Sequence, residues 1–287
     1  MVEYNPKDWF SLIFKFHKSD TFRKLMPLMI CVGIYATIVV YIETNYFHIK
    51  SSGTVHSLLG FVISMLLVFR TNTAYERWWE GRKLLGSLLN NSRNLAIKLT
   101  AMLKNDSLHK EQARIIIGNY ALALVEHLSE KHKYFVLKDH EAYPINEVLQ
   151  AEHKPNAVAL QLMNFITSLV DKKRLTPNDI LFLKYELSSF TEIIGACERI
   201  KKSPIPYSYS IFIKKFIFVY IMTIPLFFSQ DFGYAIVPLT IFIFYVLVSI
   251  EMIAEEIEDP FNGDSNDLPM HDIAQNIRRN IKEIFHQ

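Results

Sequence analysis

Two stretches of the sequence gather charged and aromatic side chains beside apolar runs. The first extends from Phe69 to Trp79 and contains Arg70 and Arg77. The second extends from Glu255 to Asp267 and is strongly acidic. Charged groups beside an apolar helix can pair with one another, mark an ion path or bind a cation. On physical grounds alone, an interfacial aromatic belt and a solvated helix end explain the two stretches equally well.

The common signatures of catalysis do not occur in the sequence. It has no glycine-rich phosphate loop, no GxSxG elbow and no His-Glu-x-x-His helix. His127 and His132 are five residues apart, which is poor spacing for two ligands on one helix face, so we expect both to face solvent. Cys31 and Cys197 lie far apart and indicate two free thiols. We predict a protein that is not an enzyme and requires no cofactor.

Four apolar segments must position the charged stretches. The uncharged runs cover residues 25–42, 55–69, 216–230 and 232–250. About 20 residues cross a bilayer core, so the two shorter runs suffice only if they extend into flanks where lysine and arginine can snorkel. Either short run alone would also suit a buried helix of a soluble core, but two closely linked pairs favour hairpins in a membrane. We therefore predict transmembrane helices over residues 25–43, 55–75, 211–230 and 232–252.

Basic residues near the segment ends set the expected orientation. Arg23 and Lys24 precede the first segment, and further basic residues follow the second and precede the third, whereas the short links hold only Lys50. The positive-inside rule then places both termini and the long middle stretch in the cytoplasm. The net charge of +2 is too small to indicate nucleic acid as a partner.

The predicted cytosolic part, residues 76–205 and 253–287, has helical patterns. Between Ala113 and Leu128, apolar residues recur at four-residue steps. Thr176 and Pro177 have the types found at a helix start, and the residues from Ser203 to Pro206 should break the chain. Glycine is sparse and no strand-like alternation appears. We predict an all-α membrane protein in which residues 1–287 form a single subunit.

Three motifs resemble the bestrophin family. They are Phe-Arg-x-Asn-x-x-Tyr-x-Arg-Trp-Trp at 69–79, Glu-Asp-Pro-Phe-x-x-Asp-x-Asn-Asp-Leu-Pro at 258–269, and Gly-Ala-Cys-Glu-Arg-Ile at 195–200 followed by Pro-Ile-Pro. The last motif is similar to the bacterial branch in particular, and the likeness extends from Asp8 to about Ile277. The resemblance implies a homopentamer around one central ion pore, embedded in the lipid bilayer of a bacterial inner membrane.

The resemblance also implies two constrictions in the pore. Its narrow neck corresponds to Phe61, Met65 and Phe69, whose spacing of four puts them on one helix stripe. Met65 departs from the isoleucine or phenylalanine usual in the family, and its flexible side chain suggests a softer middle ring. The cytosolic aperture corresponds to Ile180, with a register uncertainty of one or two residues.

The acidic stretch resembles a calcium clasp of the animal members. Asp264 and Asp267 are the acids that remain, because Gly263, Ser265 and Asn266 stand where those members tend to carry acids. Calcium prefers six to eight oxygen ligands, so regulation by calcium is doubtful here. We expect Glu255 to Asp259 to pair instead with Arg70, Arg77 or Arg82.

The leading hypothesis is a channel for small monovalent ions. The resemblance implies chloride and other small anions by the animal members, with a preference for cations as the alternative in the bacterial branch, and apolar rings alone do not decide the sign of the ion's charge. A secondary transporter would show inverted repeats and broken helices; Pro225 and Pro238 suggest kinks, but the hairpins share no obvious symmetry. A membrane-anchored helical scaffold without transport is the third hypothesis.

Overall fold

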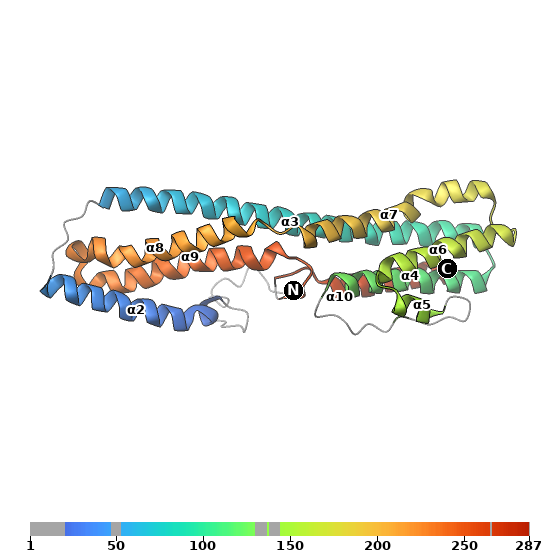
Figure 1. Ribbon diagram of the computed structural model, residues 1–287. Coiled ribbons are helices and arrows are strands. Elements are labelled where there is room, and N and C mark those ends of the chain that lie inside the picture. Colours follow the sequence, from blue (N-terminus) through green and yellow to red (C-terminus); the bar gives the residue numbers. More distant parts are fainter. Residues whose placement is uncertain (1–20, 47–52, 130–136, 138–143, 265, 287) are drawn as a thin grey trace. The chain divides into compact units, whose positions relative to one another are not determined.

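The described part of the chain is entirely helical. The computed structural model describes residues 21–46, 53–129, 137, 144–264 and 266–286, and no strand occurs among them. The described α-helices are α2 (Thr21–Asn45), α3 (Gly53–Leu103), α4 (Ser107–Leu128), α5 (Ile145–Gln150), α6 (Lys154–Asp171), α7 (Pro177–Lys202), α8 (Tyr207–Phe232), α9 (Ile236–Glu258) and α10 (Met270–Phe285) (Figure 1). The 3-10 turn η1 (Gly233–Ala235) connects α8 to α9. The all-α prediction is confirmed.

The helices form two compact units. Unit A holds the described residues of 2–77 and 204–258, and unit B holds those of 78–203 and 259–287. Among the described residues, three helical stretches are long and apolar enough to cross a membrane: 21–45, 53–103 and 207–258. The last stretch contains both α8 and α9, and the apolar part of the second belongs to unit A.

Unit A is built from α2, α8, α9 and the first half of α3. The helices α2, α8 and α9 all contact one another (Figure 1). Isoleucine side chains of α8, among them Ile217 and Ile221, meet Ile63 and Leu67 of α3 in a shared apolar cluster. Gly60 lets α3 approach α8 closely, because a Cβ there would lie 2.5 Å from the hydroxyl of Tyr220.

The turn between α8 and α9 lies later in the chain than the predicted link. The predicted transmembrane helices 211–230 and 232–252 leave only Asp231 as the link between them. In the structure, Asp231 belongs to the last turn of α8. The chain turns at Gly233–Ala235, and Gly233 has a φ of 53° that a residue without a Cβ adopts readily. The fourth apolar helix therefore begins at Ile236 rather than Phe232.

The helix α3 continues without interruption through the charged and aromatic stretch. It spans 51 residues, from Gly53 to Leu103, and thus includes Phe69 to Trp79. The sequence lacks proline over this range, which explains why no kink or end occurs. The helix therefore contributes apolar residues to unit A and core residues to unit B.

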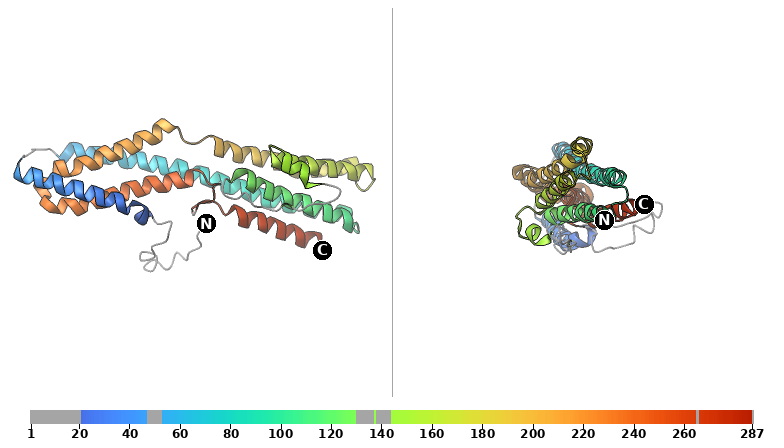
Figure 2. Two further views of the ribbon diagram at one scale, coloured as in Figure 1. Left: turned by 60° about the horizontal axis from the view of Figure 1, so that its bottom comes forward. Right: turned by 90° about the vertical axis from the view of Figure 1, so that its right-hand side faces the viewer.

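Unit B packs around α4, most of whose side chains are buried. The helices α6, α7 and α10 each contact α4 (Figure 2). The predicted helix start at Thr176 is confirmed, since α7 begins at Pro177 and the Thr176 N–H donates to the Asp179 carboxylate at 2.7 Å. The chain break before α8 is confirmed as well, because α7 ends at Lys202 and α8 starts at Tyr207.

Candidate functional site

The three residues of the predicted neck are exposed on α3. The side chains of Phe61, Met65 and Phe69 are 67%, 50% and 53% exposed within this single chain. Large apolar side chains exposed in a row usually indicate a lipid, partner or pore-facing surface. The spacing of four in the sequence thus coincides with a free face of the helix.

The neck stripe lies opposite the face by which α3 packs in unit A. The packed face contains Ile63, Leu67, Arg70 and Ala74, all nearly inaccessible. At 100° per residue, the centres of the two faces are roughly 170° apart around the helix. In the apolar 18-residue part of α3, only 22% of the residues are buried, compared with 33% in the corresponding parts of the other two apolar stretches. Of the apolar stretches, α3 therefore has the largest share of surface left to cover.

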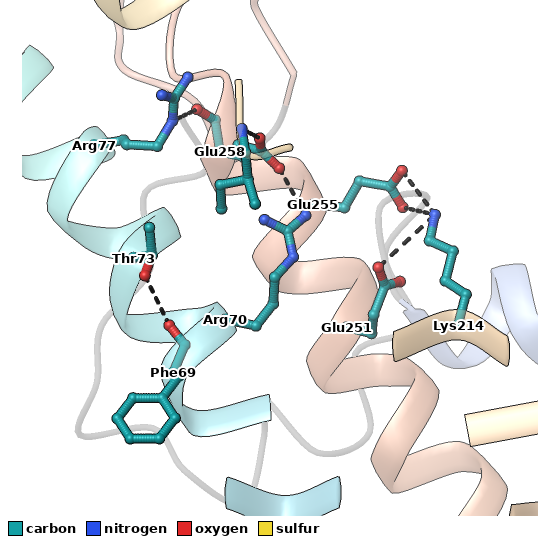
Figure 3. Close-up of polar contacts among 9 residues, drawn as sticks. Phe69, Arg70, Thr73, Arg77, Lys214, Glu251, Glu255 and Glu258 are labelled. Atoms are coloured by element: carbon teal, nitrogen blue, oxygen red, sulfur yellow. Dashed lines mark hydrogen bonds and ion pairs between the residues drawn. The ribbon is translucent and has the colours of Figure 1, made fainter. Parts of the chain in front are cut away.

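A buried ion pair joins α3 to the end of α9. Arg70 is 1% exposed, and its Nη2 lies 2.6 Å from Oε2 of Glu258. The other oxygen of Glu258 accepts the backbone N–H of Ile205 at 2.6 Å, and the Nε of Arg77 donates to the Glu258 carbonyl at 3.0 Å. Figure 3 shows Arg70 pointing toward Glu258 while Phe69, its neighbour in sequence, points away. The ion pair thus orients the stripe that contains Phe69.

Two lysines complete the charge pairing of the acidic helix end. The Nζ of Lys214, on α8, lies 2.9 Å from Glu255 and 3.8 Å from the buried Glu251 (Figure 3). The Nζ of Lys24, on α2, lies 2.5 Å from Glu256. Carboxylates at a helix C-terminus oppose the macrodipole and gain from such cations. The expected pairing is confirmed for Arg70, and Arg77 donates to the backbone carbonyl of Glu258. Lys24 and Lys214 are further partners that the sequence analysis did not name.

Sequence reasoning missed these lysines for a structural reason. Lys24 and Glu256 are 232 residues apart, and only the packing of α2 on α9 brings them together. The available signal was the cluster of basic residues at the start of two apolar segments, which served the orientation argument alone. Glu43 was missed too: it is buried and accepts a hydrogen bond from the Ser229 hydroxyl of α8.

Ile180, the candidate for the cytosolic aperture, lies in the first turn of α7. It is half-buried and packs against the apolar core of unit B. Its neighbour Leu181 is 70% exposed. The helix therefore offers two adjacent apolar side chains, one partly packed and one free, and the assignment of Ile180 stays a prediction.

Asp264 and Asp267 form a tight turn. The Asp264 side chain is exposed, whereas Asp267 is fully buried and its Oδ2 accepts the Asp264 N–H at 2.8 Å. Burial is the main cause that raises the pKa of Asp267 to about 6. One oxygen of the Asp267 carboxylate thus serves the backbone of the turn. This arrangement supplies few of the oxygens that calcium requires.

The comparisons with known proteins identify the class of protein. The sequence profile of the bacterial/fungal bestrophin proteins matches residues 1–283. The chain therefore belongs to the bacterial/fungal bestrophin family, whose curated members are named as channels rather than enzymes.

Individual relatives agree along nearly the whole chain. A voltage-dependent anion channel-forming protein of Nostoc sp. is 28% identical, covering 97% of this chain and 92% of its own. The voltage-dependent anion channel-forming protein YneE of Escherichia coli is 27% identical, covering 99% and 94%. The crystal structure of a bacterial bestrophin homologue from Klebsiella pneumoniae has a TM-score of 0.84 at 24% identity, covering 92% of this chain and all of that one. The fold is thus that of a bestrophin.

Proposed function

We propose that the chain is one subunit of a homopentameric ion channel for small monovalent ions. The proposal includes four membrane crossings, by α2, the first part of α3, α8 and α9, and cytoplasmic termini in a bacterial inner membrane. Phe61, Met65 and Phe69 line the neck, and Ile180 lines the cytosolic aperture. The relatives are named anion channel-forming proteins, which supports ion conduction. Chloride is the family's expected ion, and a preference for cations is the alternative for this branch.

The observation that carries the proposal is the exposed apolar stripe of α3. A helix whose packed face is opposite three large exposed residues needs a further surface to cover the rest of its circumference. Five copies of α3 around an axis would pack against one another side by side. Phe61, Met65 and Phe69 would then face the central ion path. Three stacked apolar rings can then block ions by excluding water.

Planar-bilayer recordings of Phe61→Ala, Met65→Ala and Phe69→Ala test this neck. Each change removes one ring of bulky side chains, so we expect a severalfold larger single-channel conductance. The matched control is Ile34→Ala on α2, where Ile30, Ile34 and Ile38 form a stripe of the same spacing and 52–58% exposure. We expect the control to conduct like the wild type.

Three other outcomes would change the assignment. Unaltered conductance in all three neck variants would place the stripe against lipid or protein. Conductance raised equally by Ile34→Ala would point to loosened packing rather than a neck. The absence of any flux in liposomes would favour a scaffold without transport. The reversal potential in asymmetric salt decides between anions and cations.

Calcium is not part of the proposed gating. Asp267 is occupied by the backbone of its own turn, so we expect the current to be nearly the same with micromolar calcium and with a chelator. A steep rise in current with calcium that is lost in Asp264→Ala would show instead that the turn binds the ion.

A further inference from the structure

Three metal-ligating side chains from three elements converge in unit B. His127 lies in the last turn of α4, His153 is the N-cap of α6, and Glu198 lies near the end of α7. One donor atom of each lies within 4.8 Å of the others, and among the described residues this is the only such group of three or more. The His127 side chain is 24% exposed, so it reaches solvent and also contacts Glu198. His132 lies outside the described residues.

Both imidazoles face the same carboxylate oxygen. His127 Nε2 lies 2.6 Å from Oε1 of Glu198, and His153 Nε2 lies 3.1 Å from it. The two rings are adjacent, with centroids 4.3 Å apart. The side chains are 20–30% exposed, so an ion from solution can reach them. Three donors are thus held close together and remain accessible.

The charge balance of the group suits a cation. Burial opposes ionisation of Glu198, but the hydrogen bond from His127 and the charges of Lys202 and the two histidines together lower its pKa. Oε1 of this carboxylate faces both imidazoles and Lys202. Lys202 Nζ lies 3.6 Å from the same oxygen on a side chain that is 72% exposed, so it can swing into solvent when a cation takes its place.

We propose that His127, His153 and Glu198 form a site for Zn²⁺ or a similar transition-metal ion. Two imidazole nitrogens and one carboxylate oxygen are a ligand set that zinc accepts, with water in the fourth position. Calcium and magnesium prefer oxygen ligands throughout. Zinc–ligand bonds of about 2.0–2.2 Å put tetrahedral donors roughly 3.3 Å apart. The two nitrogen–oxygen separations, 2.6 and 3.1 Å, need to widen by less than about 1 Å to admit the ion.

Binding requires the Nε2 proton of each imidazole to leave or move, because both Nε2 atoms face Oε1 of Glu198. His153 Nδ1 accepts the N–H of Asn156 at 3.2 Å, so the neutral ring carries its proton on Nε2, toward Glu198. Before Nε2 can give a lone pair to zinc, its proton moves to Nδ1 or is released to solvent. The cap of α6 is exposed, and water can replace the bond to the Asn156 N–H.

The ion would connect three helices that are otherwise joined mainly by apolar packing. Its ligands come from the end of α4, the start of α6 and the end of α7, so a single ion would tie together elements far apart in sequence. A ligand that binds only the folded state stabilises it by mass action. Zinc should therefore raise the thermal stability of the whole chain by several degrees.

Calorimetric titration of the purified full-length protein with ZnCl₂ in mild detergent tests the proposal. We expect one Zn²⁺ per chain, with affinity reduced roughly 100-fold in Glu198→Gln and in His127→Gln. The matched control is His109→Gln, because His109 also pairs with a carboxylate, Asp106, at 2.7 Å on the same helix α4. The control should bind zinc like the wild type.

A second measurement uses the wild type alone and does not depend on how the variants fold. Diethylpyrocarbonate labels accessible histidines, and mass spectrometry locates the label. We expect zinc to protect His127 and His153 and to leave the exposed His271 of α10 reactive. Equal labelling with and without zinc would overturn the proposal, as would zinc affinity that is unchanged in Glu198→Gln.

Discussion

At the scale of single residues, Arg70 forms a buried ion pair with Glu258 that stabilises unit A. Replacing Arg70 by methionine leaves Glu258, which is 12% exposed, without its cation. Removing one partner of a buried pair costs about 3–5 kcal/mol, so we expect a clearly lower Tm in detergent. Lys24→Met is the matched control, because Lys24 is 42% exposed and such pairs contribute about 0–1 kcal/mol. Equal Tm values for the two variants would refute the importance assigned to burial, and Glu258→Gln should partly rescue Arg70→Met.

The raised pKa of Asp267 leads us to predict how the stability of unit B depends on pH. Burial raises its folded-state pKa from 3.8 to about 6, so the folded protein holds the proton more tightly than the unfolded chain. Its contribution to stability is therefore complete below the unfolded pKa and is lost as pH rises through about 6. The loss by neutral pH is on the order of 3 kcal/mol. We expect Asp267→Asn to gain stability over the wild type between about pH 5 and pH 7.5, measured by thermal unfolding with a chelator present.

The exposed Asp264 supplies the control for that experiment. Asp264→Asn keeps the buried carboxyl of Asp267, so most of the pH dependence should remain. Parallel pH profiles for the wild type and Asp267→Asn would contradict the raised pKa.

At the scale of elements, the first turn of α7 allows the aperture to be located. Ile180→Ala should shift the reversal potential and cost about 1–2 kcal/mol, less than the roughly 2–5 kcal/mol of a fully buried isoleucine, because Ile180 is half-buried. Leu181→Ala is the neighbouring control, and with 70% exposure it should change stability by no more than about 0.5 kcal/mol. Recordings in asymmetric salt give the selectivity, and thermal unfolding gives the stability. A shift in Leu181→Ala alone would move the aperture by one residue.

At the scale of the whole molecule, the central expectation is a ring of subunits. The apolar helices of one chain do not enclose a pore, and α3 leaves most of its apolar surface uncovered. We expect the protein in mild detergent to have a mass about five times the 33.5 kDa of the chain, measured by light scattering with the detergent subtracted. A monomeric or dimeric mass would eliminate the assignment of Phe61, Met65 and Phe69 to a neck.

The sequence by itself determined the helices, their caps and the apolar stripes, because these depend on residues within about four positions of one another. Nearby residues were enough to predict the start of α7 at Pro177, the break at Ser203 to Pro206 and the spacing of the neck residues. The family could also be recognised, since its motifs are continuous in sequence. Helix ends were less certain: Gly233 moved the last turn past Asp231.

Only the tertiary structure decided which distant side chains meet. The pairs Lys24–Glu256 and Arg70–Glu258 and the group His127, His153 and Glu198 each join different helices. Their contacts depend on how helices are rotated and packed, and no local spacing encodes this. The five-residue spacing of His127 and His132 argued against a metal site on one helix. The imidazole that lies beside His127 is instead that of His153, at the start of α6. Burial acts in the same way, because it sets the pKa of Asp267 through the surroundings rather than through its neighbours in sequence.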